Sequence, residues 1–458
     1  MPNDDQLPGI EYTAQAFSPL INGDVRLSID GGGLTVAALF DVVTITFAEI
    51  NAIETSNLSV TVRADSGEYI FSHLGSWSEL FYDELCDAYN KAVLRSLFIS
   101  GRPIVFAKGD CSFDENGATA GSAAPVHVYE NNVTALPPNL AARRVPLCFL
   151  TGLEIGNYEL TLKLDTGESY TYARLGYETQ PFVDAIDTQI RKMRENTIAA
   201  VREIDPSLTT AQASQLVRLV PRGAAAPIGV LAEIAPSFTA ALERKITATR
   251  ANETYLAFRE ICDPSLIWIG FKKDETPGGE ANGDAGAGVG AGSAFPGMPG
   301  GILPGGANTG FPGILIDDDS ELPGMPGGLA DGMSDADGVE NEGSAGPDPY
   351  LLWMIAPSPD GRFAAVEFAM KDSATFVYNT GGDFATFARK LNHALEAINF
   401  RREVIQLSDA ELRKPEYAAY YMAAKRTKAL QFVRANFKGR VIHSRISAWK
   451  RKLEELWN

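Results

Sequence analysis

Two stretches about a hundred residues apart repeat one pattern, and this duplication constrains the fold more than any other feature of the sequence. "VRADSGEY" at 62–69 returns as "KLDTGESY" at 163–170. In both, alternating apolar and polar residues flank an Asp-Ser/Thr-Gly turn signal, which is typical of two β-strands joined by a tight turn. We therefore expect two hairpins, with Asp65 and Asp165 as turn residues on a solvated surface.

The alternative is a two-lobed aspartic protease, in which each lobe contributes one carboxylate to a sheltered cleft. The flanking residues are too polar for such a cleft. Arg63 and Lys163 precede the two aspartates, and Glu68 and Glu168 follow the glycines. We therefore predict that the two carboxylates do not form a catalytic pair.

The repeat extends well beyond the turns, because each copy predicts a series of strands followed by one amphipathic helix. In the first copy we expect strands at 25–30, 34–39, 43–50, 58–64 and 68–74. In the second copy we expect them at 126–129, 133–138, 145–150, 158–164 and 169–175. A weaker third copy has strands at 266–271, 351–356, 363–370 and 374–379, followed by a helix.

Strands closed by a single C-terminal helix in about a hundred residues resemble the pleckstrin-homology-like (PH-like) family. The resemblance is carried by the two hairpins, by the capping helices, and by "FAEINAIE" (47–54) and "CFLTGLEI" (148–155), which we place in the middle of each sheet. It is a resemblance to the multi-copy forms in bacterial proteins of unassigned role. It implies an α+β fold of tandem antiparallel sheets or barrels, each capped by a C-terminal helix, that serves as a binding or scaffolding module.

Lipid-binding members of that family use a basic cluster on an early hairpin. The corresponding stretches here are "DGGG" (30–33) and "ENNV" (130–133), and neither contains Lys or Arg. We therefore do not expect phosphoinositide binding.

The composition divides the chain into five parts, including a helical spacer and a helical tail. These are a first PH-like domain at 1–99, a second at 100–197, a helical spacer at 198–262, a third PH-like domain at 263–402 split by an insertion at 276–348, and a basic helical C-terminal region at 403–458.

The insertion is rich in Gly, Pro and Asp, and we expect it to be disordered because it cannot bury enough apolar surface to offset the entropy of ordering. The stretch from Asp274 to Asp348 has fourteen acidic residues and no Lys or Arg. Within it "FPGMPGGI" at 295–302 recurs as "LPGMPGGL" at 322–329, either as short docking motifs or as a low-complexity repeat without function. The candidate partner-binding residues are Phe295, Met298, Ile302, Phe311, Leu322, Met325 and Leu329.

The end of the chain has the opposite charge, with sixteen Lys and Arg against seven acidic residues from Arg389 onward. Aromatic residues alternate with these cations, so the region could bind nucleic acid or another anion. The other interpretation is a helical region whose aromatic residues face a core, with the acidic insertion as a partner within the chain. The candidate anion-binding residues are Arg401, Arg402, Lys425, Arg426, Lys450, Arg451 and Lys452.

The sequence contains no recognisable catalytic, cofactor or metal motif. The four cysteines and four histidines are far apart, and no apolar run is long enough to span a membrane. The start of the chain does not resemble a signal peptide. We therefore predict a non-enzymatic cytoplasmic scaffold or adaptor for protein partners. The alternatives are an anion- or nucleic-acid-binding module acting through the tail, and an enzyme with a composite site assembled from scattered residues.

Overall fold

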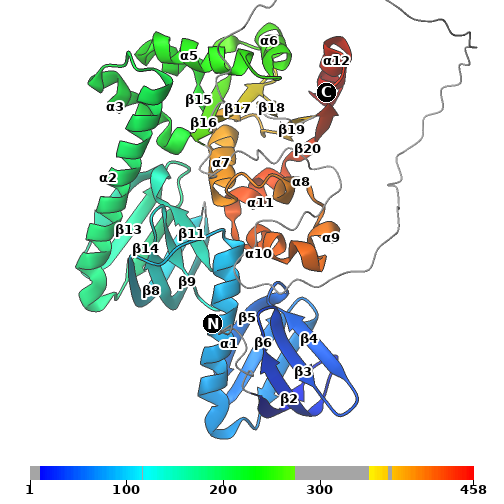
Figure 1. Ribbon diagram of the computed structural model, residues 1–458. Helices are drawn as coiled ribbons and strands as arrows, with labels where there is room; N and C mark the ends of the chain where they lie inside the picture. The colour runs from blue at the N-terminus through cyan, green and yellow to red at the C-terminus, as the bar shows by residue number, and fades with distance from the viewer. Residues whose placement is uncertain (1–10, 116, 274–349, 370–373, 458) are drawn as a thin grey trace, which may run out of the picture. The chain divides into compact units, whose positions relative to one another are not determined.

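The computed structural model describes residues 11–115, 117–273, 350–369 and 374–457 (Figure 1). The seven candidate partner-binding residues of the insertion, from Phe295 to Leu329, lie outside these ranges. The described part has an α+β fold with three antiparallel sheets of seven, seven and six strands.

The first unit is a seven-stranded sheet followed by one helix. Its strands are β1 (Tyr12–Phe17), β2 (Gly23–Ile29), β3 (Gly33–Ala37), β4 (Val42–Thr46), β5 (Ile50–Ser56), β6 (Ser59–Ala64) and β7 (Gly67–Ser72), in the spatial order β4-β3-β2-β1-β7-β6-β5. Helix α1 (Ser78–Ser96) follows a short 3-10 turn at Gly75–Trp77. Its buried stripe of Phe81, Leu85, Tyr89 and Val93 closes the core, as the helical spacing predicts.

The second unit repeats this topology. Its strands are β8 (Val105–Glu115), β9 (Ala118–Val128), β10 (Asn132–Ala135), β11 (Arg143–Pro146), β12 (Leu150–Ile155), β13 (Glu159–Leu164) and β14 (Ser169–Ala173), in the order β11-β10-β9-β8-β14-β13-β12. Helix α2 (Thr179–Ile204) follows, and buries Phe182 and Ile186. The two units also share an ion pair at equivalent positions: Arg63–Glu54 in the first unit corresponds to Lys163–Glu154 in the second.

The sequence prediction placed "FAEINAIE" and "CFLTGLEI" in the middle of each sheet, and this is wrong. These stretches lead into β5 and β12, which are the last strands in the order of their sheets. Each sheet therefore remains open between its terminal strands and does not close into a barrel. A bulge at the same place, between Ile50 and Ala52 and between Leu150 and Gly152, bends each edge strand.

The third sheet is a meander that differs from the first two. Its strands are β15 (Ala226–Pro227), β16 (Trp268–Lys273), β17 (Tyr350–Pro357), β18 (Phe363–Phe368), β19 (Ala374–Asn379) and β20 (Phe437–Ile442), each paired with the next. Strand β15 comes from the predicted spacer, and β20 interrupts the tail that the sequence predicts as helical. The predicted third copy therefore supplies only the four central strands, from β16 to β19.

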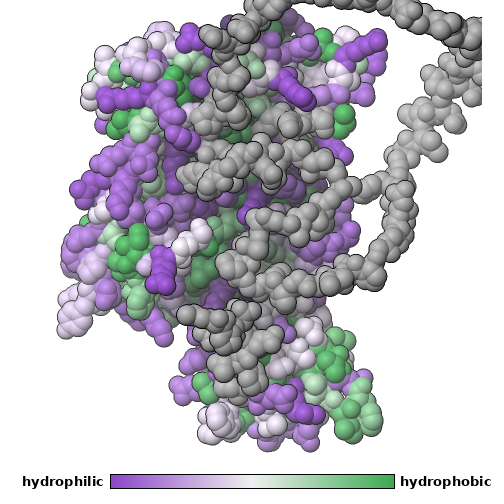
Figure 2. Space-filling model, viewed as in Figure 1, coloured by the Kyte–Doolittle hydropathy of each residue, from purple (hydrophilic) through white to green (hydrophobic). Residues whose placement is uncertain are grey.

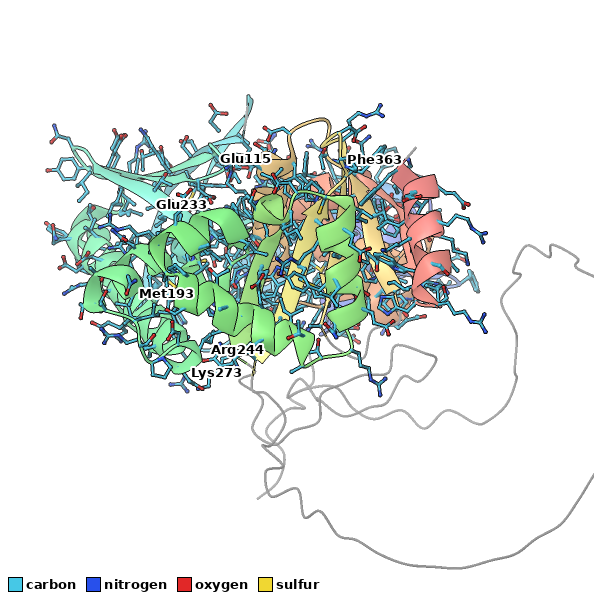
Figure 3. All side chains as sticks on the ribbon, turned by 90° about the horizontal axis from the view of Figure 1, so that it is seen from above. Glu115, Met193, Glu233, Arg244, Lys273 and Phe363 are labelled. Atoms are coloured by element: carbon cyan, nitrogen blue, oxygen red, sulfur yellow. The ribbon has the colours of Figure 1, made fainter. Side chains whose placement is uncertain are left out.

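Helices cover both faces of the third sheet. One face packs against α3 (Thr210–Leu219), α4 (Ile228–Ile234), α5 (Pro236–Thr247), α6 (Asn252–Ile261) and α12 (Ile446–Trp457). The other packs against α7 (Phe384–Ala397), α8 (Glu403–Gln406), α10 (Ala418–Arg426) and α11 (Lys428–Ala435), while α9 (Asp409–Leu412) precedes α10. Figure 3 shows the spacer helices alongside these strands. Because both faces are covered, all six residues of β18 are buried.

Strand β16 contains a glycine that the packing of the third sheet requires. A Cβ added at Gly270 would lie 2.2 Å from the ring of Trp353, which is almost completely buried. We expect Gly270→Ala to lower the free energy of unfolding by about 1–3 kcal/mol, because the indole has no room to move. Urea denaturation followed by tryptophan fluorescence measures this loss.

The matched control is Gly439→Ala in β20 of the same sheet, where the nearest atom to an added Cβ is the Leu456 side chain at 3.7 Å. That variant should unfold at nearly the wild-type urea concentration. Equal losses in the two variants would contradict the packing argument.

Candidate functional site

The turn aspartate of the first unit binds a helix from the end of the chain. Asp65 and Ser66 form the β6–β7 turn, and Gly67 has a positive φ of 131°. The Asp65 carboxylate accepts hydrogen bonds from Asn51 at 3.0 Å, from the Tyr421 hydroxyl at 2.8 Å and from the Lys425 ammonium at 3.0 Å. Tyr421 and Lys425 belong to α10, so this carboxylate joins residues more than 350 positions apart.

Burial by itself raises the pKa of the Asp65 carboxyl, but the hydrogen bonds from Asn51, Lys425 and Tyr421 outweigh it and lower the pKa. The Asp65 side chain is 30% exposed and that of Lys425 only 15%. A half-buried ammonium of this kind requires the carboxylate beside it.

The turn aspartate of the second unit makes the equivalent contact with a different helix. His393 of α7 donates its Nε2–H to the Asp165 carboxylate at 2.6 Å. The imidazole also stacks on Phe149, with ring centroids 4.0 Å apart. His393 is 5% exposed, so it is a buried residue and not part of a solvated helix face.

These contacts settle the question raised by the repeated Asp-Ser/Thr-Gly motif. The prediction of two hairpin turns is confirmed, and each aspartate binds a separate helix instead of its counterpart. Both aspartates lie at the surface, as predicted, but a helix partly covers each of them and each side chain is 30% exposed. The sequence could not indicate this, because the partners Tyr421, Lys425 and His393 are far away in the chain.

We expect Asp65→Asn to lower the free energy of unfolding by about 1–2 kcal/mol, because it leaves the half-buried Lys425 without its counter-charge. Hydrogen exchange of the α10 amides, measured by mass spectrometry, should become faster. The control is Glu54→Gln, which breaks an ion pair of the same unit whose side chains are about half exposed. An exposed pair contributes about 0.2–1 kcal/mol, so this variant should change α10 little. Equal acceleration in both variants would refute the assignment.

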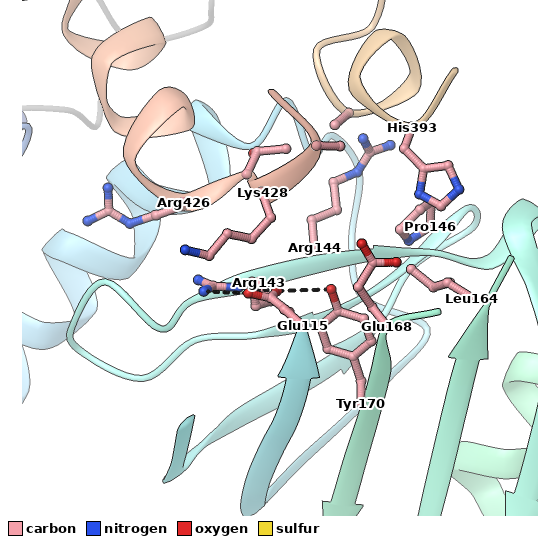
Figure 4. A pocket seen from close by; sticks show the side chains of 13 residues that line it. Glu115, Arg143, Arg144, Pro146, Leu164, Glu168, Tyr170, His393, Arg426 and Lys428 are labelled. Carbon is pink, nitrogen blue, oxygen red and sulfur yellow. Dashed lines mark hydrogen bonds and ion pairs between the residues drawn. The ribbon is translucent and has the colours of Figure 1, made fainter. Parts of the chain in front are cut away.

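A small cavity lies beside these contacts, between the second unit and α7, α10 and α11 (Figure 4). Glu115 on its wall is 7% exposed and binds Arg143 through two hydrogen bonds, at 2.7 and 3.2 Å. The Tyr170 hydroxyl donates to the same carboxylate at 3.0 Å, and burial together with Glu115 raises the pKa of Tyr170 well above its usual value. The cavity has a volume of about 40 Å³, enough for a water molecule or two but not for a substrate.

A wider groove of about 300 Å³ lies between α2 and β16 and is lined by residues that include Met193, Glu203 and Lys273. Figure 3 labels Met193 and Lys273. The Lys273 ammonium contacts the Glu203 carboxylate at 2.7 Å across the groove. This pair neutralises one of the three cations that line the groove, and Arg222 there pairs with Glu396 of α7 at 3.6 Å.

A buried acidic group lies within the third sheet. Glu367 of β18 is 1% exposed, and its carboxylate accepts hydrogen bonds from the Thr375 hydroxyl at 2.5 Å and the His443 ring at 3.1 Å. The indole of Trp449 donates to the Thr375 hydroxyl at 2.9 Å. Burial raises the pKa of Glu367, and the hydrogen bond to Glu367 raises that of His443. Through His443 and Trp449, these hydrogen bonds connect the end of β20 and helix α12 to strands β18 and β19.

The raised pKa of His443 predicts a pH dependence of stability. A group whose pKa is higher in the folded state stabilises the fold below its unfolded value of about 6.5, and loses that effect as the pH rises through the folded value. We therefore expect the melting temperature to fall as the pH rises above about 6.5. His443→Gln should flatten this slope.

His127 provides the control, because burial lowers its pKa. Its contribution is present above the unfolded pKa and is lost below it, so His127→Gln should leave the slope above about pH 6.5 unchanged. A slope that persists in His443→Gln would count against the assignment.

Five of the seven candidate anion-binding residues contact other parts of the chain at specific sites. Arg401 and Arg402 lie over the rings of Phe98 and Phe368. Lys425 binds Asp65, Arg426 is almost fully buried beside the Tyr89 hydroxyl, and Lys450 pairs with Glu260. Arg451 and Lys452 are exposed on α12, where Arg451 lies 3.8 Å from Glu455. Anion binding by these seven residues stays a prediction. Of the seven, only Arg451 and Lys452 are exposed, and both belong to α12.

The turn between β3 and β4 exposes large apolar side chains, which the sequence analysis did not single out. Leu39 is 86% exposed, Phe40 is 90% and Val42 is 67%. Figure 2 shows hydrophobic surface at the β3–β4 side of the first unit. Three neighbouring apolar side chains in water are unusual for a hairpin turn. The signal in the sequence was "ALFDVV" at 38–43, where a polar turn is expected.

Comparisons with known proteins do not identify a family for this chain. No family model and no curated protein matches the chain. Among the solved structures that match is the "Structure of the Spt16D Pob3N heterodimer", which is 10% identical over 34% of this chain and 84% of that chain, with a TM-score of 0.13. A likeness this weak carries no argument, so the fold assignment rests on the sheets described above.

Within the described residues, no helix is both long and apolar enough to cross a membrane. In the same part of the chain, no group of three or more His, Cys, Asp or Glu side chains is arranged to hold a metal ion.

Proposed function

We propose that this protein is a non-enzymatic adaptor that binds protein partners through the surfaces of its PH-like units. The observation that carries the proposal is the exposed apolar turn of Leu39, Phe40 and Val42. Aromatic and aliphatic side chains of this kind act as anchors when a partner covers them, and a few such residues dominate the binding energy of most interfaces. The proposal includes a cytoplasmic location, a bacterial origin and further docking motifs in the acidic insertion.

The use of ionisable groups supports the non-enzymatic part of this proposal. Asp65, Asp165, Glu115 and Glu367 all bind side chains of other elements within the chain. These pairs stabilise contacts between elements, and the cavity beside Glu115 has no room for a substrate. An enzyme with a composite site would need a free reactive group in a larger hollow, and the carboxylate that lines the 300 Å³ groove, Glu203, is paired with Lys273.

The second candidate function, anion binding by the tail, rests on Arg451 and Lys452. Both are exposed on α12. Exposed cations on a helix bind phosphate weakly and with strong salt dependence. If they are the site, replacing both with Gln would abolish salt-sensitive retention on a phosphate column without changing the contacts of the apolar turn.

The test of the adaptor function uses a photoreactive benzoylphenylalanine in place of Phe40, introduced into the full chain in its native cells. We expect covalent adducts with protein partners, because the ring at this position would be covered in a complex. The double variant Leu39→Asp/Phe40→Asp should reduce partner recovery at least about tenfold in affinity purification. Its stability should be unchanged, since both side chains are exposed.

The control is Leu58→Asp in the same unit, which changes a side chain that is 70% exposed but lies in another turn, between β5 and β6. It should leave partner recovery at the wild-type level. Absence of any adduct at position 40, with recovery unaffected by the double variant, would overturn the proposed function.

A further inference from the structure

The two PH-like units contact each other through a loop of the second and an edge strand of the first. The loop joins β10 to β11 and reaches the outer side of β5. The N–H of Ile53 donates to the Pro138 carbonyl at 2.8 Å, and the N–H of Leu140 donates to the Asn51 carbonyl at 3.0 Å. This loop therefore extends the sheet of the first unit beyond β5, the mode of binding called β-augmentation.

Apolar side chains accompany these backbone bonds. Leu136 and Ala142, at the two ends of the loop, are 1% and 0% exposed and belong to the core of the first unit. Ile53, at the centre of the contacted edge, is 2% exposed. The contact thus has two parts, a loop with apolar side chains and a strand edge that offers an N–H and a C=O.

Because the units share one topology, each of these parts exists a second time. The first unit has the equivalent loop, residues 38–41 between β3 and β4. The second unit has the equivalent edge strand, β12, in which Thr151 and Leu153 take the places of Asn51 and Ile53 beside the same bulge. Leu39 and Phe40 of the loop are exposed, and Leu153 is only half-buried where Ile53 is covered.

The edge of β12 has the backbone geometry that the contact requires. Pairing of Leu153 with Leu162 corresponds to that of Ile53 with Val62, so its N–H is directed away from β13 as that of Ile53 is directed away from β6. Among the described residues, no strand pairs with this side of β12, which is the last strand of its sheet. An open edge of this kind is a template for another strand or loop.

We propose that the chain self-associates head to tail, with the β3–β4 loop of one copy docked on the β12 edge of a second copy. We assign a second copy as the partner because the equivalent loop and edge, the β10–β11 loop and β5, already bind each other within the chain. The loop of the first unit has four residues and that of the second has seven. Leu39 and Phe40 would supply the apolar contacts that Leu136 and Ala142 supply within the chain.

An interface between two different surfaces of the same chain is heterologous, and it leaves one loop and one edge free at the ends of every assembly. Copies therefore add in series unless the rotation between them closes a ring. This inference rests on the proposed function, since it names the partner of the same apolar turn.

Sedimentation equilibrium of the full chain over a range of concentrations tests the proposal. We expect the weight-average mass to rise with concentration. Phe40→Asp removes the anchor, and Thr151→Lys places a charge on the edge without removing any buried side chain. Each should weaken self-association at least about tenfold. The control Tyr177→Asp changes a fully exposed aromatic residue of the second unit and should associate as wild type does.

Cysteine pairing locates the contact. Chains with Phe40→Cys and chains with Thr151→Cys should form a disulfide-linked dimer when they are mixed under mild oxidation. Each variant alone should give far less, because the contact places its introduced cysteine against a native residue of the other copy. The native thiols interfere little, since burial raises the pKa of Cys86, Cys111 and Cys262 to about 12 and also raises that of Cys148.

A chain that remains monomeric at about 0.1 mM would overturn self-association, because even a weak specific contact is populated there. Association that Phe40→Asp and Thr151→Lys both leave unchanged would also overturn it. Neither result touches the proposed function if benzoylphenylalanine at position 40 still captures a different protein. Adducts that contain only this chain would support both proposals at once.

Discussion

The structure depends on long-range bonds between the turns of the repeated units and the helices that lie between β19 and β20 of the third sheet. A carboxylate in a β-turn is normally solvated, and its ion pairs are worth little. Here Asp65 and Asp165 are each partly covered by a helix, which leaves 30% of each side chain exposed and partly shields the bonds to Lys425 and His393 from water. The duplication therefore produced two equivalent attachment points, and the C-terminal part of the chain uses one helix for each.

The pattern of the sequence predicts local structure well and long-range contacts poorly. The hairpins around Asp65 and Asp165 and the capping helices are visible in it, because alternation and helical spacing are local signals. The position of β5 and β12 at the sheet edges is not visible, since strand order depends on contacts across the chain. Neither is β20, whose residues, 437–442, alternate weakly and become a strand only by pairing with β19.

The same limit applies to the candidate sites. Counting charges identified a basic tail, but it could not show that Arg426 is buried against Tyr89 or that Lys425 neutralises Asp65. The apolar turn at Leu39 and Phe40 was not predicted, because Leu39 falls at the end of the strand expected at 34–39, where an apolar residue indicates a core position. The geometry of the sheet distinguishes them, because it leaves Leu39 and Phe40 outside the core.

The third sheet has a consequence for how the chain reaches its folded state. The first two units are built from contacts within about a hundred residues each, so they can form while the rest is still being synthesised. Strand β19 can pair on its outer edge only after β20 has been synthesised, and about sixty residues of helix and loop lie between the two strands. Until residues 437–442 leave the ribosome, the edge of β19 has no strand beside it and the carboxyl of Glu367 lacks the imidazole that accompanies it in the finished protein. The nascent chain therefore has an interval in which this half-built sheet needs protection from other unfolded chains.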